Sequence, residues 1–182
     1  MSHPLRFLAA WTLALSLAAS CDAGSTFLAD GYALRVWQTE DGLPQNIVTS
    51  AIQTRDGFLW FGTYSGLARF DGERFEIFDT ATAPELGDQR IESLFEDAKG
   101  TLWIGHETGG ITRCVDGKFE PVALPTQNKD ERVIAIGSDE NGQVWAMHMN
   151  GDLDALEGSG RHLPSLIAPD PPSVMAWSRS PG

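Results

Sequence analysis

Two histidines occupy equivalent positions of a repeating pattern, and their chemistry is the first to consider. His106 and His148 lie 42 residues apart, each three residues after a tryptophan, and Glu107 adjoins the first of them. Such groups could supply half of a metal site. Zinc, however, takes three or four ligands, and no others align here. We therefore predict no metal and no cofactor. The alternative is that both histidines lie in turns between two strands.

Recognisable catalytic groupings do not stand out in the sequence. There is no Ser/His/Asp arrangement, phosphate-binding glycine loop or pair of carboxylates, and most acidic residues sit in turns, where they have a local conformational role. The chain itself is therefore predicted to be non-catalytic. Ligand-contacting residues are expected in loops held by a rigid scaffold. The candidates in such loops are Tyr64, His106, Glu107 and His148.

A tryptophan recurs at nearly constant spacing and indicates what that scaffold is. Trp60, Trp103 and Trp145 are 43 and 42 residues apart, within the phrases Asp-Gly-Phe-Leu-Trp-Phe-Gly, Lys-Gly-Thr-Leu-Trp-Ile-Gly and Asn-Gly-Gln-Val-Trp-Ala-Met. One tryptophan and one turn glycine every 40 to 45 residues or so is typical of β-propeller blades. Stacked blades share a core only with their neighbours. We therefore expect the tryptophans to be buried between sheets.

The second repeat shows how one blade is expected to form. Asp116-Gly117 suits a two-residue turn with positive φ, and Asp71-Gly72 and Ser159-Gly160 are predicted to serve the other repeats in the same way. Strands of the second repeat are predicted at residues 91–96, 101–106, 111–115 and 118–121. The predicted fold is an all-β β-propeller with about three four-stranded antiparallel blades of an incomplete ring. These blades are placed at about 47–79, 90–122 and 132–163.

The segments before and after the predicted blades allow further predictions. A ring normally needs at least four blades, so the chain is predicted to be a fragment or an open array, with the remaining blades of the parent chain as partners. Alternating apolar residues in 32–39 predict an N-terminal strand that closes the last blade. Residues 164–182 are rich in proline, which central strands exclude, and are interpreted as a linker or truncated end.

The first 20 residues predict export. Arg6 precedes an apolar run at 7–19 and then small residues, which is the pattern of a secretory signal peptide. The run is too short to span a bilayer. Cys21 follows Leu-Ala-Ala-Ser, which resembles a lipoprotein processing site except that Ala18 replaces the usual leucine. Both lipidation of Cys21 and simple cleavage remain open. Cys114 is expected to pack as a small apolar side chain.

Charge excludes one class of partner. The chain has 13 basic and 25 acidic side chains and a net charge of −12. Nucleic-acid binding depends on clustered Lys and Arg residues, and none cluster here. We therefore predict no nucleic-acid partner.

The repeats resemble the two-component regulator propeller family. The opening phrase Trp-Gln-Thr-Glu-Asp-Gly-Leu-Pro-Gln-Asn at 37–46 is similar to the start of its sensor domains. Its repeat pattern is Asp-x-x-Gly-x-Leu-Trp-Ile-Gly-Thr, which the second repeat matches at Asp97, Gly100, Leu102, Trp103, Ile104 and Gly105. The first repeat departs from it at Thr54, which replaces the aspartate, and the third at Met147, which replaces the glycine. The resemblance covers residues 32 to about 157.

The resemblance implies a periplasmic, ligand-sensing module of a two-component signal transduction protein. The parent would be a membrane sensor histidine kinase acting in a phosphorelay, a related regulator, or a diguanylate cyclase. Expected partners are an unknown small molecule or glycan-like ligand, with membrane tethering through the parent or a lipidated Cys21. The alternative is an exported propeller enzyme, such as a lyase or a quinone-dependent dehydrogenase. That enzyme would need His, Glu or Arg residues converging from several blades.

Overall fold

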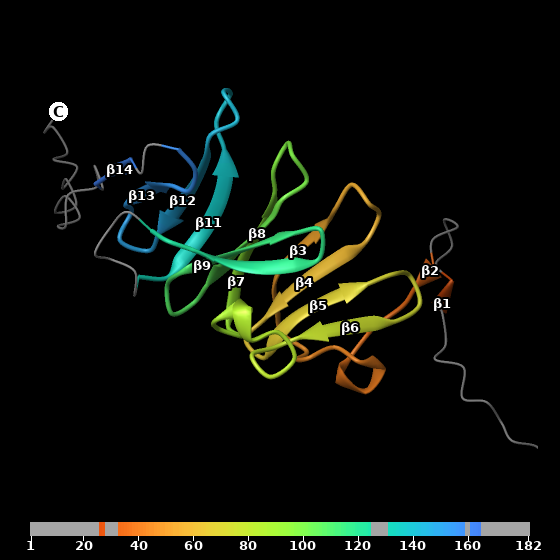
Figure 1. Cartoon of the computed structure of the whole chain (residues 1–182). Helices are drawn as coiled ribbons and strands as arrows, with labels where there is room; N and C mark the ends of the chain where they lie inside the picture. Colours follow the sequence, from red (N-terminus) through yellow and green to blue (C-terminus); the bar gives the residue numbers. More distant parts are fainter. Residues whose placement is uncertain (1–25, 28–32, 125–130, 159–160, 165–182) are drawn as a thin grey trace, which may run out of the picture. The chain divides into compact units, whose positions relative to one another are not determined.

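A computed structural model of the chain describes residues 26–27, 33–124, 131–158 and 161–164 (Figure 1). Backbone contacts divide the chain into two units, Met1–Val36 and Trp37–Gly182. Within the described residues, no helix is long and apolar enough to cross a bilayer. Four predicted features lie outside the described residues: the signal peptide at 1–20, Cys21, the Ser159-Gly160 turn, and all but the first residue of the segment 164–182.

The first unit contains a short two-stranded sheet. Strand β1 (Thr26–Phe27) pairs antiparallel with β2 (Ala33–Leu34). The prediction of one strand over 32–39 is therefore wrong in extent, because among the described residues of this segment only Ala33–Leu34 is a strand. The chain turns instead at the 3-10 helix η1 (Thr39–Asp41), where the Asp41 carboxylate accepts a hydrogen bond from the backbone N–H of Gln38 at 2.9 Å. Closure of a ring by this segment stays a prediction.

The second unit contains three four-stranded antiparallel sheets, each with its strands in chain order. The first sheet consists of β3 (Val48–Gln53), β4 (Leu59–Thr63), β5 (Gly66–Phe70) and β6 (Phe75–Phe78). The second consists of β7 (Ile91–Glu96), β8 (Leu102–His106), β9 (Ile111–Val115) and β10 (Lys118–Val122). The third consists of β11 (Val133–Ser138), β12 (Val144–His148), β13 (Leu153–Ala155) and β14 (His162–Leu163). The predicted all-β fold of three four-stranded blades is confirmed.

Two turns between strands show how far the local sequence determines the backbone conformation. Asp116 and Gly117 have φ values of 50° and 77°, which confirms the predicted two-residue turn. The turn at Asp71 differs from its prediction, because Phe70 pairs with Phe75 and four residues lie between them. There the Asp71 carboxylate accepts the backbone N–H groups of the third and fourth turn residues at 2.8 and 2.7 Å, which stabilises the longer turn.

The repeated tryptophans lie on the second strand of each sheet and are anchored by the preceding turn. The indole N–H of Trp103 donates to Asp97 Oδ2 at 2.9 Å, and that of Trp60 donates to Thr54 Oγ1 at 3.2 Å. Trp60 and Trp103 are 5% and 0% exposed, which confirms that they are core residues. Trp145 has the equivalent bond to Asp139, but its ring is only half-buried.

Neighbouring sheets pack through their first strands, β3 against β7 and β7 against β11 (Figure 1). Between the first two sheets, the Thr49 hydroxyl donates to the carbonyl oxygen of Ile91 at 2.8 Å. Between the second and third, the Ser93 hydroxyl donates to the carbonyl oxygen of Val133 at 3.1 Å. Each interface also has its own apolar cluster, one around Trp60 and Ile104 and one around Trp103 and Val144. These interfaces fix the ends of the strands relative to one another.

Candidate functional site

The predicted candidate residues lie at one end of the three sheets, where the second strand of each sheet finishes. Thr63, His106 and His148 are the last residues of these strands, and they pair with the first residues of β3, β7 and β11. Tyr64 and Glu107 are the next residues along the chain. The turn after each second strand therefore lies beside the start of the first strand, and we call this end of the sheets the rim.

Five side chains from the three sheets form one polar cluster at the rim. The Glu107 carboxylate lies 2.8 Å from Arg90 Nε and 2.6 Å from Arg132 Nη2. Arg132 Nη1 lies 3.8 Å from Glu92 Oε1, and the Tyr64 hydroxyl donates to Glu92 Oε2 at 3.0 Å. Tyr64 belongs to the first sheet, Arg90, Glu92 and Glu107 to the second, and Arg132 precedes the third. We call these five residues the rim cluster.

The backbone holds the rim cluster in place. The N–H of Glu107 donates to the carbonyl oxygen of Arg90 at 2.8 Å, and the N–H of Met149 donates to that of Arg132 at 2.9 Å. In the second and third sheets, the turn after the second strand is thus hydrogen-bonded to the residue that precedes the first strand of the same sheet. In the first sheet the side chain of Gln45 replaces this contact, accepting from the N–H of Tyr64 at 3.2 Å.

Positively and negatively charged side chains alternate in the rim cluster. The hydrogen bond to the Glu92 carboxylate, followed by burial, raises the pKa of Tyr64 above its usual value, so this residue remains a hydroxyl donor. The guanidinium of Arg90 lies 5.2 Å from the centre of the Tyr64 ring. The side chains of Arg90 and Arg132 are 47% and 35% exposed, so solvent and solutes can reach both cations. The cluster offers donors, acceptors and one aromatic face.

His106 lies beneath the rim and is only 2% exposed. The Thr112 hydroxyl donates to the carbonyl oxygen of Leu86 at 2.9 Å, so it accepts the proton of His106 Nε2, also at 2.9 Å. Burial lowers the pKa of His106 to about 4, because desolvation of the charged ring outweighs the opposing influence of Asp88. His106 is therefore neutral, and among the described residues its Nδ1 has no hydrogen-bond partner.

His148, the equivalent residue of the third sheet, is fully buried in a different environment. Its Nδ1 lies 3.1 Å from the carbonyl oxygen of Glu131 and its Nε2 lies 2.9 Å from Asp154 Oδ2. The other oxygen of Asp154 lies 2.9 Å from Nδ1 of His162. Both nitrogens of His148 thus lie within hydrogen-bond distance of oxygen atoms.

The two histidines therefore do not meet in a shared site. Each bonds to the residue six positions further along its own sheet, Thr112 for His106 and Asp154 for His148. The structure places both beneath the rim as the last residues of their strands, which agrees with the strand predicted at 101–106 and not with the alternative of turn residues. In the part of the chain that the structure describes, no group of three or more His, Cys, Asp and Glu residues could hold a metal ion. A ligand-binding role for either histidine stays a prediction.

The sequence profile of the two component regulator propeller matches residues 42–65 and 85–108. Two segments of the chain are thus similar to the repeat of this family, and we call them the regulator propeller repeats. Each matched segment includes a first strand, a second strand with its tryptophan, and the rim turn that follows. Tyr64 and Glu107 thus lie in equivalent turns of the two regulator propeller repeats.

Similar proteins include a kinase and several propeller structures. Histidine kinase P4 of Formosa agariphila is 38% identical over 59 residues, which are 30% of this chain and 4% of the kinase. Two extracellular domains assigned to hybrid two component systems of B. thetaiotaomicron match with TM-scores of 0.60 and 0.54 and identities of 24% and 19%. The matches cover 75% and 66% of this chain but only 18% and 17% of those chains.

One further structural match is to an enzyme. Virginiamycin B lyase of Staphylococcus aureus matches with a TM-score of 0.60 at 19% identity, over 79% of this chain and 48% of the lyase. At these identities the solved structures establish a shared propeller fold. The chain spans well under two thirds of the kinase, the extracellular domains and the lyase.

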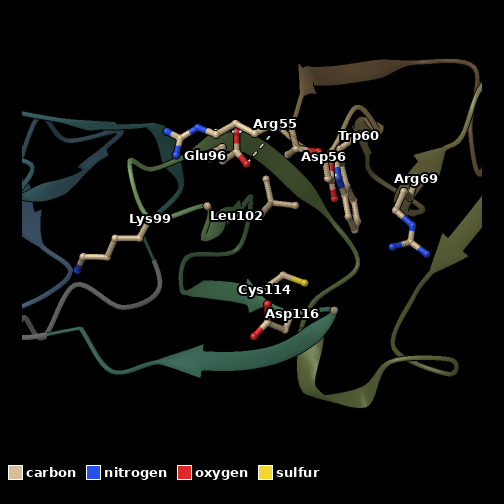
Figure 2. A pocket seen from close by; sticks show the side chains of 12 residues that line it. Arg55, Asp56, Trp60, Arg69, Glu96, Lys99, Leu102, Cys114 and Asp116 are labelled. Carbon is tan, nitrogen blue, oxygen red and sulfur yellow. Dashed lines mark hydrogen bonds and ion pairs between the residues drawn. The ribbon is translucent and has the colours of Figure 1, made fainter.

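A cavity of about 310 Å³ lies between the two regulator propeller repeats, at the strand ends opposite the rim (Figure 2). Its charged groups bond to the protein itself. Arg55 donates to the carbonyl oxygens of Asp97 and Ala98 at 2.9 and 2.6 Å, and its N–H donates to the Glu96 carboxylate. Cys114 in the wall is buried in the apolar cluster around Trp60, which confirms that it packs as an apolar side chain, and this burial raises the pKa of its thiol. These contacts hold the two repeats together.

Three members of the rim cluster escaped the sequence prediction, namely Arg90, Glu92 and Arg132. A signal was present, because Arg90 and Arg132 are 42 residues apart and each directly precedes a first strand. This is the spacing of the tryptophans. Of the predicted residues, the structure places Tyr64 and Glu107 in the cluster and leaves His106 and His148 below it.

Proposed function

We propose that the chain is an extracytoplasmic ligand-sensing propeller module of a two-component signal transduction protein. Its parent would be a membrane sensor histidine kinase or a related regulator, and the module would lie on the periplasmic side of a bacterial membrane. The observation that carries this proposal is the presence of two regulator propeller repeats. The similarity of 59 residues to a histidine kinase supports the same class of parent.

The rim cluster is the proposed ligand contact. It is built from three sheets, so a ligand that binds it touches three repeats at once, and its contacts favour one relative arrangement of those sheets. A ligand that binds one packing arrangement of the sheets more tightly increases the fraction of molecules in that arrangement. An output domain joined to the sheets can respond to this change. Alternating arginines and carboxylates beside the Tyr64 ring suit a small polar ligand with many hydroxyl groups, such as a glycan fragment.

The proposal can be tested by ligand screening on the purified chain. Soluble oligosaccharides and small polar metabolites are added and the melting temperature is recorded. A ligand of this site should raise the melting temperature of the wild-type chain. Arg132→Gln breaks the ion pairs to Glu107 and Glu92 and should weaken binding by at least about tenfold, or about 1.4 kcal/mol. Tyr64→Phe should weaken it less.

Arg113→Gln is the matched control. It removes an arginine of the same sheet whose guanidinium lies 2.7 Å from Glu120, on strands β9 and β10 away from the rim. Binding should be unchanged in this variant. A ligand that binds equally well to the wild type and Arg132→Gln would place the site elsewhere. A product formed from the ligand during incubation would favour the enzyme alternative.

A further inference from the structure

Neighbouring sheets meet through two kinds of face. We call the face toward the following sheet the onward face and the face toward the preceding sheet the leading face. A Cβ atom on Gly62 would lie 2.7 Å from Cγ2 of Ile91, and one on Gly105 would lie 2.8 Å from Cγ1 of Val133. The first residue of each following sheet thus rests directly on a glycine of the onward face before it.

A second pair of positions meets at the rim of both interfaces. There the residue after each second strand lies beside the residue that precedes the first strand of the following sheet. The guanidinium of Arg90 lies 5.2 Å from the centre of the Tyr64 ring, and Arg132 Nη2 lies 2.6 Å from Glu107 Oε1. The two interfaces therefore share one pattern of contacts, which shows what an onward face requires of its partner.

The onward face of the third sheet is apolar and uncovered among the described residues. Its tryptophan, Trp145, is half-buried, while Met147 at the glycine position and Met149 at the rim position are 37% and 64% exposed. A cavity of about 350 Å³ lies over this face, lined by Trp145, Met147, Ile136 and Leu153 among others. An open apolar surface of this kind marks an interaction site.

The leading face of the first sheet is also open among the described residues, at the positions that contact an onward face. Ile47 and Val48 stand 43 residues before Arg90 and Ile91, and they are equivalent to them in the repeat. Ile47 is 62% exposed and Val48 is 41% exposed, whereas Ile91 is fully buried. The residues that would rest on a preceding sheet thus face solvent.

The middle of this leading face is only partly covered. Leu59 and Phe61 are half-buried, whereas their equivalents in the second sheet, Leu102 and Ile104, are buried in the cluster around the tryptophan of the first sheet. Trp37 packs edge-on against a phenylalanine of β5 and so covers the part of the face beyond β4. The open area therefore lies along β3 and β4, the strands whose equivalents contact the preceding sheet.

The two open faces match each other in chemistry. Both interfaces within the chain have an arginine at the rim position, whereas the open faces have Met149 and Ile47 there, which suit one another and not a charged partner. At the position beneath, the open faces have Met147 and Val48, which are also apolar. Two copies of the chain supply six sheets, and closed propellers typically have about four to eight. A second copy can therefore satisfy both open faces at once.

We propose that the onward face of the third sheet binds the leading face of the first sheet in a second copy of this chain. Met149 of one copy then lies against Ile47 of the other, and Met147 lies against Val48. Phe61 of the second copy enters the cavity beside the tryptophan of the third sheet. Met147 is larger than the glycines at its position, and its flexible side chain bends aside, so this contact is looser than those within the chain. Two such contacts join two copies into a symmetric dimer.

The contact is tested by cross-linking two variants of the complete chain, Met147→Cys and Val48→Cys, each in a Cys21→Ser background. Equivalent Cβ positions are 3.0 and 3.2 Å apart at the two interfaces within the chain, and disulfides need about 3.5–4.5 Å, which suits a looser contact. An equal mixture of the two variants, exposed to oxidised glutathione, should give a disulfide-linked dimer that contains one of each. Either variant alone should give no such dimer.

The other outcomes of this experiment would overturn the proposal. A cross-linked dimer of Met147→Cys alone would show that two onward faces meet each other. A mixture that stays uncross-linked, with Met147→Cys protected from iodoacetamide in a monomer, would show that the chain covers this face itself.

A second measurement does not depend on disulfide geometry. Met149→Glu and Ile47→Arg each place a charge against an apolar residue of the other copy. Each should raise the dissociation constant of the dimer, measured by sedimentation equilibrium, by at least about tenfold, or about 1.4 kcal/mol. The double variant should regain most of the lost affinity, because the new pair copies Glu107 and Arg132.

Val115→Glu is the matched control for the charge. Val115 is 37% exposed, but it lies on β9 of the second sheet and in neither apolar cluster. This variant should dimerise as the wild type does, and circular dichroism checks that every variant is folded. A wild-type chain that stays monomeric at about 100 µM, or a double variant that regains no affinity, would overturn the proposal.

Discussion

The second and third sheets have almost the same strands but very different surroundings. All five residues of β8 are buried, because the first sheet covers one face and the third sheet covers the other. In β12, Val144, Ala146 and His148 are buried against the second sheet, while Trp145 is half-buried and Met147 is exposed. Equivalent positions of the repeat thus differ in burial because, among the described residues, the second sheet has a neighbour on each face and the third sheet has a neighbour on one face.

The difference shows where the stability of such a chain resides. Strand pairing and the tryptophan-to-turn hydrogen bond are present in both sheets, so they do not distinguish them. What distinguishes them is the apolar cluster that only an adjacent sheet can complete. In repeat proteins the interface between neighbours supplies a large share of the free energy of folding. Substitutions at equivalent positions of the two sheets should therefore have unequal effects.

The largest expected effect is at the tryptophans. Trp103→Ala empties a fully buried site and breaks the bond to Asp97, and it should lower the free energy of unfolding by about 3–5 kcal/mol. Trp145→Ala in the monomeric chain should cost only about 1–2 kcal/mol, because its ring is already partly in solvent. Urea unfolding followed by circular dichroism measures both losses.

If Trp103→Ala does not fold, Trp103→Phe retains enough apolar area to be measured. Equal losses for the two tryptophans would contradict the dependence on neighbours.

Much of the fold could be predicted because it follows from local sequence repeated at a fixed interval. The strands of the second repeat and the Asp116-Gly117 turn each depend on a few adjacent residues. Burial of Trp60 and Trp103 was predicted from their constant spacing, which indicated stacked sheets. The turn at Asp71 could not be foreseen, because Asp-Gly suits both a two-residue turn and a longer one. Hydrogen bonds from the Asp71 carboxylate favour the longer turn.

The rim cluster was harder to predict because its contacts cross between sheets. Which side chains meet there depends on how far one sheet is rotated relative to the next and on which rotamers long side chains adopt. Tyr64 and Glu107 were expected at the rim from their turns alone. Their partners Arg90, Glu92 and Arg132 lie at or directly before the start of a first strand. The sequence analysis used the apolar residues of these strands and did not consider the charged residues beside them. Burial of His106 and His148 likewise depends on neighbouring sheets.

The next effect concerns His106 and should appear as a dependence of stability on pH. The folded state keeps this residue neutral down to about pH 4, whereas in the unfolded chain it is protonated below about pH 6.5. The unfolded state therefore binds more protons between these values, and stability is lost as the pH falls through them. The loss should reach about 3 kcal/mol in urea titrations from pH 7 to pH 4.

His106→Gln is the variant that isolates this contribution. Its amide can still donate to Thr112, but it cannot be protonated, so the curve of stability against pH should become shallower between pH 6.5 and 4. Other groups that titrate in this range remain in both proteins, and their contributions cancel in the difference. If the wild type and the variant gave parallel curves, His106 would not be a buried neutral residue.

The smallest expected effect concerns the hydroxyl that joins the second sheet to the third. Ser93 is buried and donates to the carbonyl oxygen of Val133, while Ala135 holds the equivalent position of the third sheet and has no hydroxyl. Ser93→Ala should therefore lower the free energy of unfolding by about 1 kcal/mol, the typical net value of one hydrogen bond. Ser138→Ala, at the exposed end of β11, should change it by less than about 0.5 kcal/mol. Equal effects of the two substitutions in urea unfolding would show that the interface between the sheets depends on apolar contact alone.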